Sequence, residues 1–234
     1  FHGLQRFSED LDFSLLQPEP NFSLEPYLSA VADELAAWGF DFRAERIEKT
    51  KPTSIESAFL KGSTIINLLQ IGAPPEMASR LPKGQLIRIK LEIDLDPPPG
   101  ATTEVLSRLV PTPHQIRVYD LPSLFAGKLH AVLCRNWKSR VKGRDFYDLI
   151  WYAGRRTPLN LAHLEARMRQ SGDWPKEAPL DTPGLRQRLA ERFAAVDFEQ
   201  AKEDIAPFLK DPRELRLWSA QFFLELIPQI RTGK

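Results

Sequence analysis

The sequence is poor in the features that would cross-link the chain or embed it in a membrane. Cys134 is the only cysteine among the 234 residues, so a disulfide framework within the chain is excluded. A single cysteine with apolar neighbours is typical of a reducing compartment, and we expect a packed thiol in a cytoplasmic protein. No run approaches the ~20 apolar residues of a membrane span, and no basic-then-apolar signal segment opens the chain.

Net charge says equally little about partners. The 32 basic and 31 acidic side chains leave a net charge of +1, so a nucleic-acid-binding surface would have to be local. The chain also lacks internal repeats, low-complexity tracts and a Gly-rich phosphate loop. The four histidines show no metal-ligand spacing with the cysteine. A content of 42% hydrophobic and 27% charged residues indicates a globular protein of one large or two small domains.

A short acidic stretch near the start of the chain is the first candidate site. Apart from the extra acid Glu9, residues 7–13 alternate between apolar and polar, which predicts a strand with Asp10 and Asp12 on one face and Leu11 and Phe13 on the other. Two neighbouring carboxylates repel each other unless a cation lies between them. Mg²⁺ prefers carboxylate oxygens and often completes its shell with phosphate. The pattern therefore fits either a Mg²⁺-phosphate site or an edge strand with one solvated face.

A second strand is predicted over residues 86–96. Its apolar residues alternate with charged ones along the whole segment, so that one face is apolar and the other is charged. The charged face is either simply solvated or lies beside the first strand. In the second case Glu92 or Asp94 would contribute a third carboxylate to the same cation.

Helices are predicted beyond residue 118. Asp120 is a suitable cap for a helix that runs to about Asn136. Lys128 falls inside the apolar stripe of that helix, where a lysine needs a partner. It either extends to the surface along the edge of the core or points at a phosphate or carboxylate cluster.

The segment after this helix is basic. It interleaves Trp137 with five cations, a pattern that suits either a nucleic-acid backbone or a solvated loop. The next predicted helix begins near Arg144 and has Asp145 and Asp148 on one face. Further helices are predicted at residues 161–170, 183–193, 198–209 and 213–227. An aromatic stripe on the last of these, Trp218, Phe222 and Phe223, is typical of a core or a partner surface.

Four segments, taken in order, resemble the AbiEii/AbiGii-type toxin family of nucleotidyltransferases, which belongs to the DNA-polymerase-β-like superfamily. Together they cover the chain from Phe1 to about Tyr152. The segments are His2-Gly3-x-x-Arg6-Phe7-Ser8-x-Asp10-Leu11-Asp12-Phe13, Ile89-Lys90-Leu91-Glu92-Ile93, Leu124-Phe125-Ala126-Gly127-Lys128-Leu129-His130-Ala131 and Arg144-Asp145-x-Tyr147-Asp148-Leu149.

The resemblance implies an α+β fold, with a small mixed β-sheet and flanking helices followed by an α-helical C-terminal domain. We place the nucleotidyltransferase-like core at residues 1–119 and the helical domain at residues 120–234. The resemblance also implies roles for particular residues. The implied metal ligands are Asp10 and Asp12, with Glu92 or Asp94 as the third. The implied catalytic residues are Asp10, Asp12, Lys128 and Asp145 or Asp148. Nucleotide and phosphate contacts are expected from Arg6, Ser8, Lys90 and Lys128, and RNA contacts from Arg135, Lys138, Arg140 and Arg144.

The function implied by the resemblance is Mg²⁺- or Mn²⁺-dependent transfer of a nucleotide from NTP to an RNA, with tRNA as the expected acceptor. Such a protein is the toxin of a toxin–antitoxin or phage-defence pair, so an antitoxin is an expected partner. The family carries a Gly-Gly or Gly-Ser element upstream of the Asp-x-Asp strand, which these 234 residues do not contain. We therefore expect either an N-terminally truncated piece of an active protein or an inactive member that binds nucleotide, RNA or a partner protein.

Overall fold

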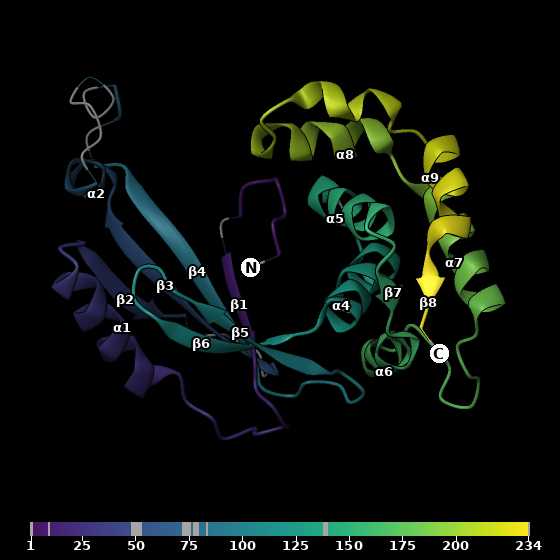
Figure 1. Ribbon diagram of the computed structural model, residues 1–234, viewed down its shortest axis with the longest axis horizontal. Helices are drawn as coiled ribbons and strands as arrows, with labels where there is room; N and C mark the ends of the chain where they lie inside the picture. The colour runs from purple at the N-terminus through teal and green to yellow at the C-terminus, as the bar shows by residue number, and fades with distance from the viewer. Residues whose placement is uncertain are drawn as a thin grey trace. The chain divides into compact units, whose positions relative to one another are not determined.

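The computed structural model describes residues 2–8, 10–47, 53–71, 76, 80–82, 84–137 and 140–233 (Figure 1). The chain divides into two compact units. The sheet unit is Ser8–Pro97, and the helical unit combines Phe1–Phe7 with Pro98–Lys234. The predicted α+β class is confirmed.

The sheet unit is built on a four-stranded sheet with the strand order β1-β4-β3-β2. Strand β1 runs parallel to β4, whereas β3 is antiparallel to both β4 and β2, so the sheet is mixed as the resemblance implied. The strands are β1 (Asp10–Ser14), β2 (Phe42–Arg46), β3 (Ile55–Ser63) and β4 (Leu86–Asp94). Both strands predicted from alternation, near residues 7–13 and 86–96, are therefore present.

One face of this sheet carries the small core of the unit. Leu24 and Leu28, at the start of helix α1 (Glu25–Ala37), are buried in a cluster with Ala58 of β3 and Ile93 of β4. Because side chains alternate along a strand, the charged residues of β4 lie on the opposite face. A second helix, α2 (Thr64–Gln70), follows β3 directly. The face without α1 is thus the one that carries the predicted site.

The helical unit opens with an antiparallel hairpin of β5 (Thr103–Arg108) and β6 (His114–Tyr119). Its helices are α4 (Leu121–Cys134), α5 (Gly143–Gly154), α6 (Leu161–Ser171), α7 (Thr182–Ala195), α8 (Phe198–Ile205) and α9 (Ala220–Leu226). Short 3₁₀ helices are η1 (Ala206–Phe208), η2 (Pro212–Leu217) and η3 (Ile227–Gln229), and a two-stranded parallel pair joins β7 (Pro158–Leu159) to β8 (Arg231–Thr232). In the described residues no helix has both the length and the apolar run that a membrane crossing requires.

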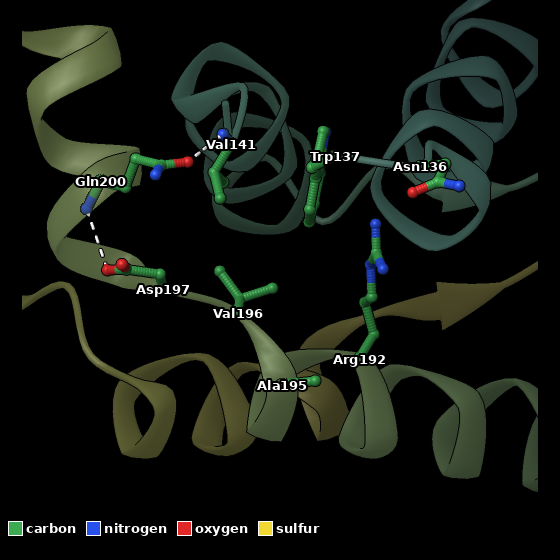
Figure 2. Close-up of a pocket in the computed structure, with 8 residues that line it drawn as sticks. All are labelled: Asn136, Trp137, Val141, Arg192, Ala195, Val196, Asp197 and Gln200. Atoms are coloured by element: carbon green, nitrogen blue, oxygen red, sulfur yellow. Dashed lines mark hydrogen bonds between the residues drawn. The ribbon is translucent and has the colours of Figure 1, made fainter. Parts of the chain in front are cut away.

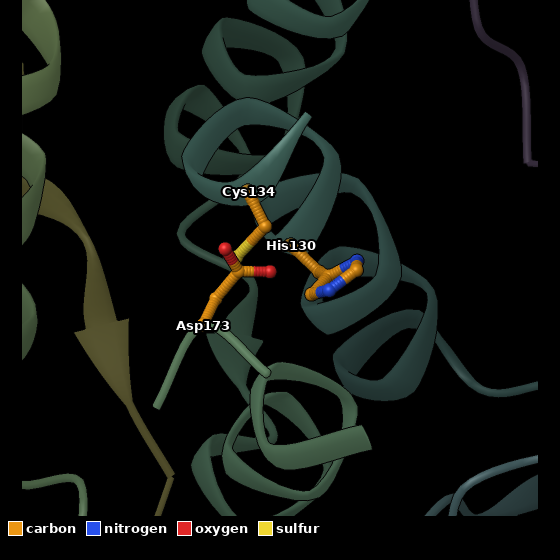
Figure 3. Close-up of side chains that lie close together, drawn as sticks. All are labelled: His130, Cys134 and Asp173. Carbon is orange, nitrogen blue, oxygen red and sulfur yellow. The ribbon is translucent and has the colours of Figure 1, made fainter. Parts of the chain in front are cut away.

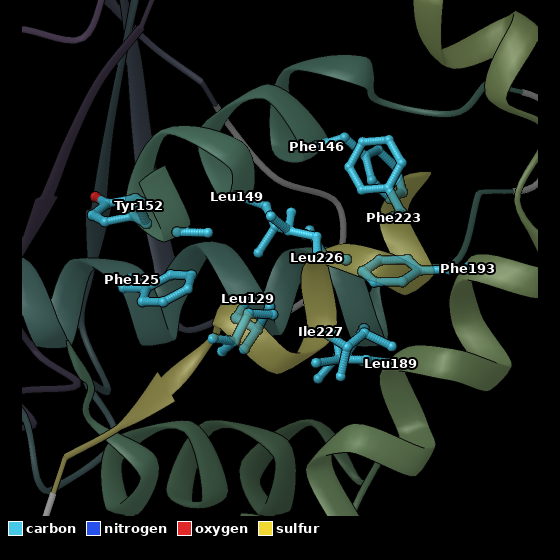
Figure 4. Close-up of a cluster of buried hydrophobic side chains, with 14 of the residues drawn as sticks. Phe125, Leu129, Phe146, Leu149, Tyr152, Leu189, Phe193, Phe223, Leu226 and Ile227 are labelled. Carbon is cyan, nitrogen blue, oxygen red and sulfur yellow. The ribbon is translucent and has the colours of Figure 1, made fainter. Parts of the chain in front are cut away.

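The core of the helical unit combines aliphatic side chains with a cluster of aromatic rings (Figure 4). Phe146 of α5 is fully buried and meets the rings of Phe198 and Phe223 edge-on, each with centroids 5.3 Å apart. Trp218 packs against Phe223 as well, at 5.5 Å. Edge-to-face pairs at such distances add to the free energy gained from burying the rings. The aromatic stripe near the C-terminus is therefore core.

Two features differ from the sequence-based expectation. The helix predicted over residues 213–227 is interrupted, because Trp218 and Ser219 are extended and the Ser219 hydroxyl caps α9 by accepting a hydrogen bond from the Phe222 amide at 3.2 Å. The hairpin before α4 groups with the helices, whereas we placed the domain boundary at residues 119 and 120. Thr102 accounts for this grouping, because its amide donates to the Ser123 hydroxyl of α4 at 2.9 Å.

Candidate active site

The register of β1 against β4 assembles an acidic face. Asp10 pairs with Lys90 and Asp12 pairs with Glu92, while Ser14 pairs with Asp94. Partners in a parallel ladder point to the same side of the sheet, so the four carboxylates share the face opposite to α1. The acidic face is defined here as Asp10, Asp12, Glu92 and Asp94 with Lys90. The structure thus brings together the residues that the sequence assigned to a cation site.

Glu92 is the anchored member of the acidic face. Its Oε1 lies 2.7 Å from the Lys90 ammonium and accepts a hydrogen bond of 3.3 Å from the Ser57 hydroxyl. Ser57 is only 2% exposed and faces Glu92 from β3, so it holds the carboxylate from the interior side. No motif singled out Ser57 in the sequence. Strand β3 also carries Glu56, Lys61 and Ser63, so the polarity of Ser57 did not distinguish it.

The two aspartates lie at the open side of the sheet. Asp10 and Asp12 are exposed, as expected for β1 at the edge of the strand order. Leu11 and Phe13, which the alternation places on the apolar face, remain 46% and 47% exposed. The reason is that α1 contacts β2 at the opposite edge of the sheet. The carboxylates are therefore accessible to a solvated ion.

The donor set of the acidic face fits a hard cation. Carboxylate oxygens are the ligands that Mg²⁺ and Mn²⁺ take, and the face contains no nitrogen or sulfur donor that would favour a softer metal. In the described part of the chain, the face does not bring three carboxylate oxygens within 4.8 Å of one another. A bound cation would therefore have to draw these side chains together and compete with the ion pair between Lys90 and Glu92.

In the helical unit, three predicted residues meet in one ion-pair network. Arg6 donates from Nε to Asp148 Oδ1 and from Nη2 to Asp148 Oδ2, both at 2.7 Å, and Lys128 Nζ lies 3.2 Å from Oδ2. The side chains of Asp148 and Arg6 are 1% and 7% exposed. Burial opposes the charge of Arg6, but the bonds to Asp148 outweigh it and raise the pKa of Arg6. Lys128 thus has the carboxylate partner that its place in an apolar stripe required.

Asp145 lies one turn earlier on α5 and has a different partner. Its Oδ2 accepts from Arg135 Nη1 at 2.7 Å. Burial raises the pKa of Asp145, while the charges of Arg135 and Lys128 work in the opposite direction. The two acids of the predicted motif are therefore both buried, but each is neutralised by its own arginine.

The basic segment between α4 and α5 is only partly available to a ligand. Arg140 forms an ion pair with Asp204 of α8, and the Arg144 guanidinium lies 4.5 Å from the centre of the Phe208 ring. The side chain of Arg135 is 39% exposed and that of Arg140 is 63% exposed. Lys138, the fourth predicted RNA contact, lies outside the described residues.

A cavity of about 290 Å³ adjoins the basic segment (Figure 2). The guanidinium of Arg192 lies 3.9 Å from the Trp137 ring on one side of it, and the Gln200 side chain accepts a hydrogen bond from the Val141 amide on the other. Its lining residues are Asn136, Trp137, Val141, Arg192, Ala195, Val196, Asp197 and Gln200. Arg192 covers this face of the Trp137 ring, so a nucleobase could not stack there without displacing it.

A second group of ligand-type residues was missed. The spacing of the histidines and Cys134 along the chain gave no indication of a metal site. Donor atoms of His130, Cys134 and Asp173 all lie within 4.8 Å of one another (Figure 3). The missed signal is the interval of four residues between His130 and Cys134, which puts both on one face of α4. Asp173 follows α6 and was not foreseeable from spacing.

A mixed sheet with a carboxylate-bearing face, followed by a helical unit, is the architecture that the nucleotidyltransferase resemblance implied. A family model described as "Nucleotidyl transferase AbiEii toxin, Type IV TA system" matches residues 1–226. The chain therefore belongs to the AbiEii family of nucleotidyltransferase toxins from type IV toxin–antitoxin systems, and the resemblance is confirmed. A search of curated proteins finds no match.

Proposed function

We propose that this protein is a Mg²⁺-dependent nucleotidyltransferase that transfers a nucleotide from NTP to an RNA acceptor, with tRNA as the acceptor. The observation that carries the proposal is the β1–β4 register, which puts Asp10 and Asp12 on the same face as Glu92. Three carboxylates on two adjacent parallel strands form a ligand set for divalent metal that neither strand offers alone.

The chemistry assigns distinct tasks to these residues. Divalent metal, when bound, stabilises the attacking and leaving oxygens of an in-line displacement at the α-phosphate. Asp10 and Asp12 would hold it, and Glu92 would be the third ligand, with Asp94 as the alternative on the same face. Ser57 would keep the Glu92 carboxylate turned toward the face through its hydrogen bond. Most of the protein's contribution to such a transfer is positioning and charge neutralisation.

Cations supply the phosphate contacts in this proposal. Lys90 belongs to the acidic face and is proposed to contact the phosphates of the nucleotide, together with Ser8, Arg6 and Lys128 from the resemblance. Asp145 and Asp148 remain proposed functional acids of the helical unit. The half-exposed guanidinium groups of Arg135 and Arg140, together with Arg144, are proposed to contact the RNA backbone. The family's designation as a toxin supports an antitoxin as the partner.

The decisive experiment compares single-atom carboxylate changes in the full-length protein. Wild type, Asp10→Asn and Asp12→Asn are incubated with each α-labelled NTP, Mg²⁺ and a tRNA pool, and the label retained on RNA is measured. Asp33→Asn is the matched control, because Asp33 is an exposed acid of α1, the helix on the other face of the sheet. Mn²⁺ binding is followed in parallel by electron paramagnetic resonance.

We expect labelled tRNA with wild type and Asp33→Asn, and a loss of at least a hundredfold with the two acidic-face variants. Equal labelling by Asp12→Asn and wild type would show that these carboxylates are not the metal ligands. Mn²⁺ binding that depends on Asp10 and Asp12 without any transfer would replace the enzyme with a nucleotidyltransferase-fold protein that binds without catalysing.

A further inference from the structure

The cluster of His130, Cys134 and Asp173 lies within the helical unit and contains no residue assigned to nucleotidyl transfer. His130 and Cys134 are one turn apart on α4, and Asp173 follows the left-handed Gly172 that ends α6 (Figure 3). All three are partly buried, so an ion from solvent can reach them. One imidazole, one thiol and one carboxylate therefore converge from two helix ends.

The backbone fixes the position of Asp173. Its amide donates to the Met168 carbonyl at 2.8 Å, which closes the last turn of α6. The Ser171 hydroxyl bridges the cluster: it donates to Asp173 Oδ2 at 2.6 Å and lies 2.9 Å from His130 Nε2. The imidazole and the carboxylate are thus held near each other by a neighbouring hydroxyl before any ligand arrives. Oriented ligands of this kind are a usual feature of metal sites.

We propose that His130, Cys134 and Asp173 form a site for a transition-metal ion, with Zn²⁺ as the ion. Zn²⁺ takes nitrogen, sulfur and oxygen donors in tetrahedral geometry, and three protein ligands leave the fourth position to water. Thiolate and imidazole favour Zn²⁺ over Mg²⁺, so this site and the acidic face select different metals. The three donor atoms already lie within 4.8 Å of one another, and Zn²⁺ would hold them at about 2.0–2.3 Å from the ion.

Charge and proton balance are consistent with the proposal. Binding displaces the thiol proton to solvent, so that a thiolate, a carboxylate and a divalent ion together carry no net charge. Burial and the Asp173 carboxylate raise the pKa of Cys134 to about 12, and a bound cation removes that penalty. Burial and nearby Arg167 lower the pKa of His130 to about 4, which leaves the imidazole in the neutral form that ligates metal. Arg188 and Arg192 repel a free cation but stabilise the thiolate.

The site would join the C-terminal ends of α4 and α6. These two helices already pack together, and the metal would add a bond between their C-terminal ends. Because an unfolded chain does not present the three donors together, binding stabilises the folded helical unit. Binding would therefore stabilise the packing of α4 against α6, and the fourth position of the ion would stay open to water.

Cobalt(II) provides a direct test, because Cys134 is the sole cysteine of the chain. A thiolate-to-cobalt charge-transfer band in the near ultraviolet can then arise from this residue alone. The full chain is stripped with chelator under reducing conditions and titrated with Co²⁺ and then Zn²⁺. The variants are Cys134→Ser, His130→Asn and Asp173→Asn, and His114→Asn is the control, since His114 is an exposed histidine of β6.

We expect a stoichiometric band in wild type and His114→Asn, its displacement by Zn²⁺, and its loss in Cys134→Ser. The affinity for Zn²⁺ should fall about 10- to 100-fold or more in the His130 and Asp173 variants. At a hundredfold excess over its Kd, Zn²⁺ should raise the midpoint of thermal unfolding of wild type by about 5–10 °C. Absence of the band in folded wild type would overturn the proposal.

The rate of Cys134 alkylation in the wild-type protein tests the proposal without any variant, and so it remains informative if a variant fails to fold. Zn²⁺ should slow alkylation of Cys134 at least tenfold, whereas Mg²⁺ should not. An unchanged alkylation rate would also overturn the proposal. Nucleotide transfer is not a readout in either experiment, so the outcome is independent of the proposed function.

Discussion

Arg6 and Asp148 lie 142 residues apart in the sequence and form a two-point ion pair, with both N–O distances at 2.7 Å. The pair ties the segment before β1 to helix α5 inside the helical unit. Replacement of Arg6 by Ala would leave the Asp148 carboxylate, which is 1% exposed, with Lys128 as a cation partner at the longer distance of 3.2 Å. We expect Arg6→Ala to lower the free energy of unfolding by about 3–5 kcal/mol, as measured by denaturant titration.

An exposed pair provides the control for this prediction. Arg213 and Asp211 also form a close ion pair, but their side chains are 75% and 40% exposed. Arg213→Ala should therefore leave the free energy of unfolding almost unchanged. Equal effects of the two substitutions would show that the Arg6 pair is solvated in solution.

Two glycines of helix α5 should respond to the same substitution in opposite directions. Gly143 is buried against α8, where an added Cβ would clash with the Ala201 carbonyl oxygen and lie 3.0 Å from Ile205 Cβ. Gly154, at the other end of α5, is exposed and has no atom within 4 Å of an added Cβ. We expect Gly143→Ala to destabilise the protein by about 1–3 kcal/mol and Gly154→Ala to stabilise it by about 0.5 kcal/mol.

Thermal unfolding of the two variants measures this difference, and each serves as the other's control. A loss of stability in both would mean that the added methyl group acts through the helix backbone. The specific packing of α5 on α8 would then not be the cause.

Periodicity was sufficient to predict the parts of the fold that depend on local pattern. Alternation predicted β1 and β4, and the cap at Asp120, whose side chain accepts from the Ser123 amide at 2.9 Å, predicted the start of α4. It also placed Lys128 on a buried stripe that needed a partner. These features are encoded within a few residues of each other, so a single sequence reveals them.

Local sequence pattern could not predict the interaction partners of these residues. Strand register and helix packing bring distant segments together and so determine these contacts. They decide that Asp148 forms ion pairs with both Arg6 and Lys128, and that Ser57 donates a hydrogen bond to Glu92. Asp173 joins His130 and Cys134 for the same reason. The interruption of the last helix at Ser219 was detectable in principle, since serine is a strong N-cap, but the aromatic stripe across it favoured a continuous helix.

His163 should make the stability of the helical unit sensitive to acid. It is 1% exposed, its Nδ1 lies 2.9 Å from the Pro99 carbonyl, and burial lowers its pKa in spite of that bond. Because the folded-state pKa lies below the unfolded value of 6.5, the unfolded chain binds the proton first. The contribution of His163 is therefore fully present above about pH 6.5 and is lost as the pH falls toward the folded-state pKa.

The matched variant is His163→Asn, which retains a donor for the Pro99 carbonyl but does not titrate. Unfolding free energies measured between pH 7.5 and 4.5 should fall more steeply for wild type than for this variant. His2 and His130 also have lowered pKa values, but they are common to both proteins and cancel in the difference. If the free energy of unfolding falls equally steeply with pH in both proteins, then His163 is solvated or charged in the folded protein.

Lys90 is expected to weaken metal binding and to strengthen nucleotide binding. Its ammonium lies 2.7 Å from Glu92 Oε1, so it competes with a cation for that carboxylate. Lys90→Met removes the competitor and should tighten Mn²⁺ binding to the acidic face by about two- to fivefold, the value of a half-exposed ion pair. The same change should weaken NTP binding in the presence of Mn²⁺, because an ammonium next to the phosphates is lost.

Lys61→Met is the control for the change in net charge, because Lys61 pairs with Glu45 on the neighbouring strands of the same sheet. It should leave Mn²⁺ affinity within about a factor of two, because Lys61 is paired with Glu45 and not with a carboxylate of the acidic face, and charges near the surface are screened by salt. Both constants can be measured by electron paramagnetic resonance and by calorimetric titration with a non-hydrolysable NTP. If Lys90→Met weakens Mn²⁺ binding as well, then Lys90 orients Glu92 for the metal, and its pairing with Glu92 is part of the metal site.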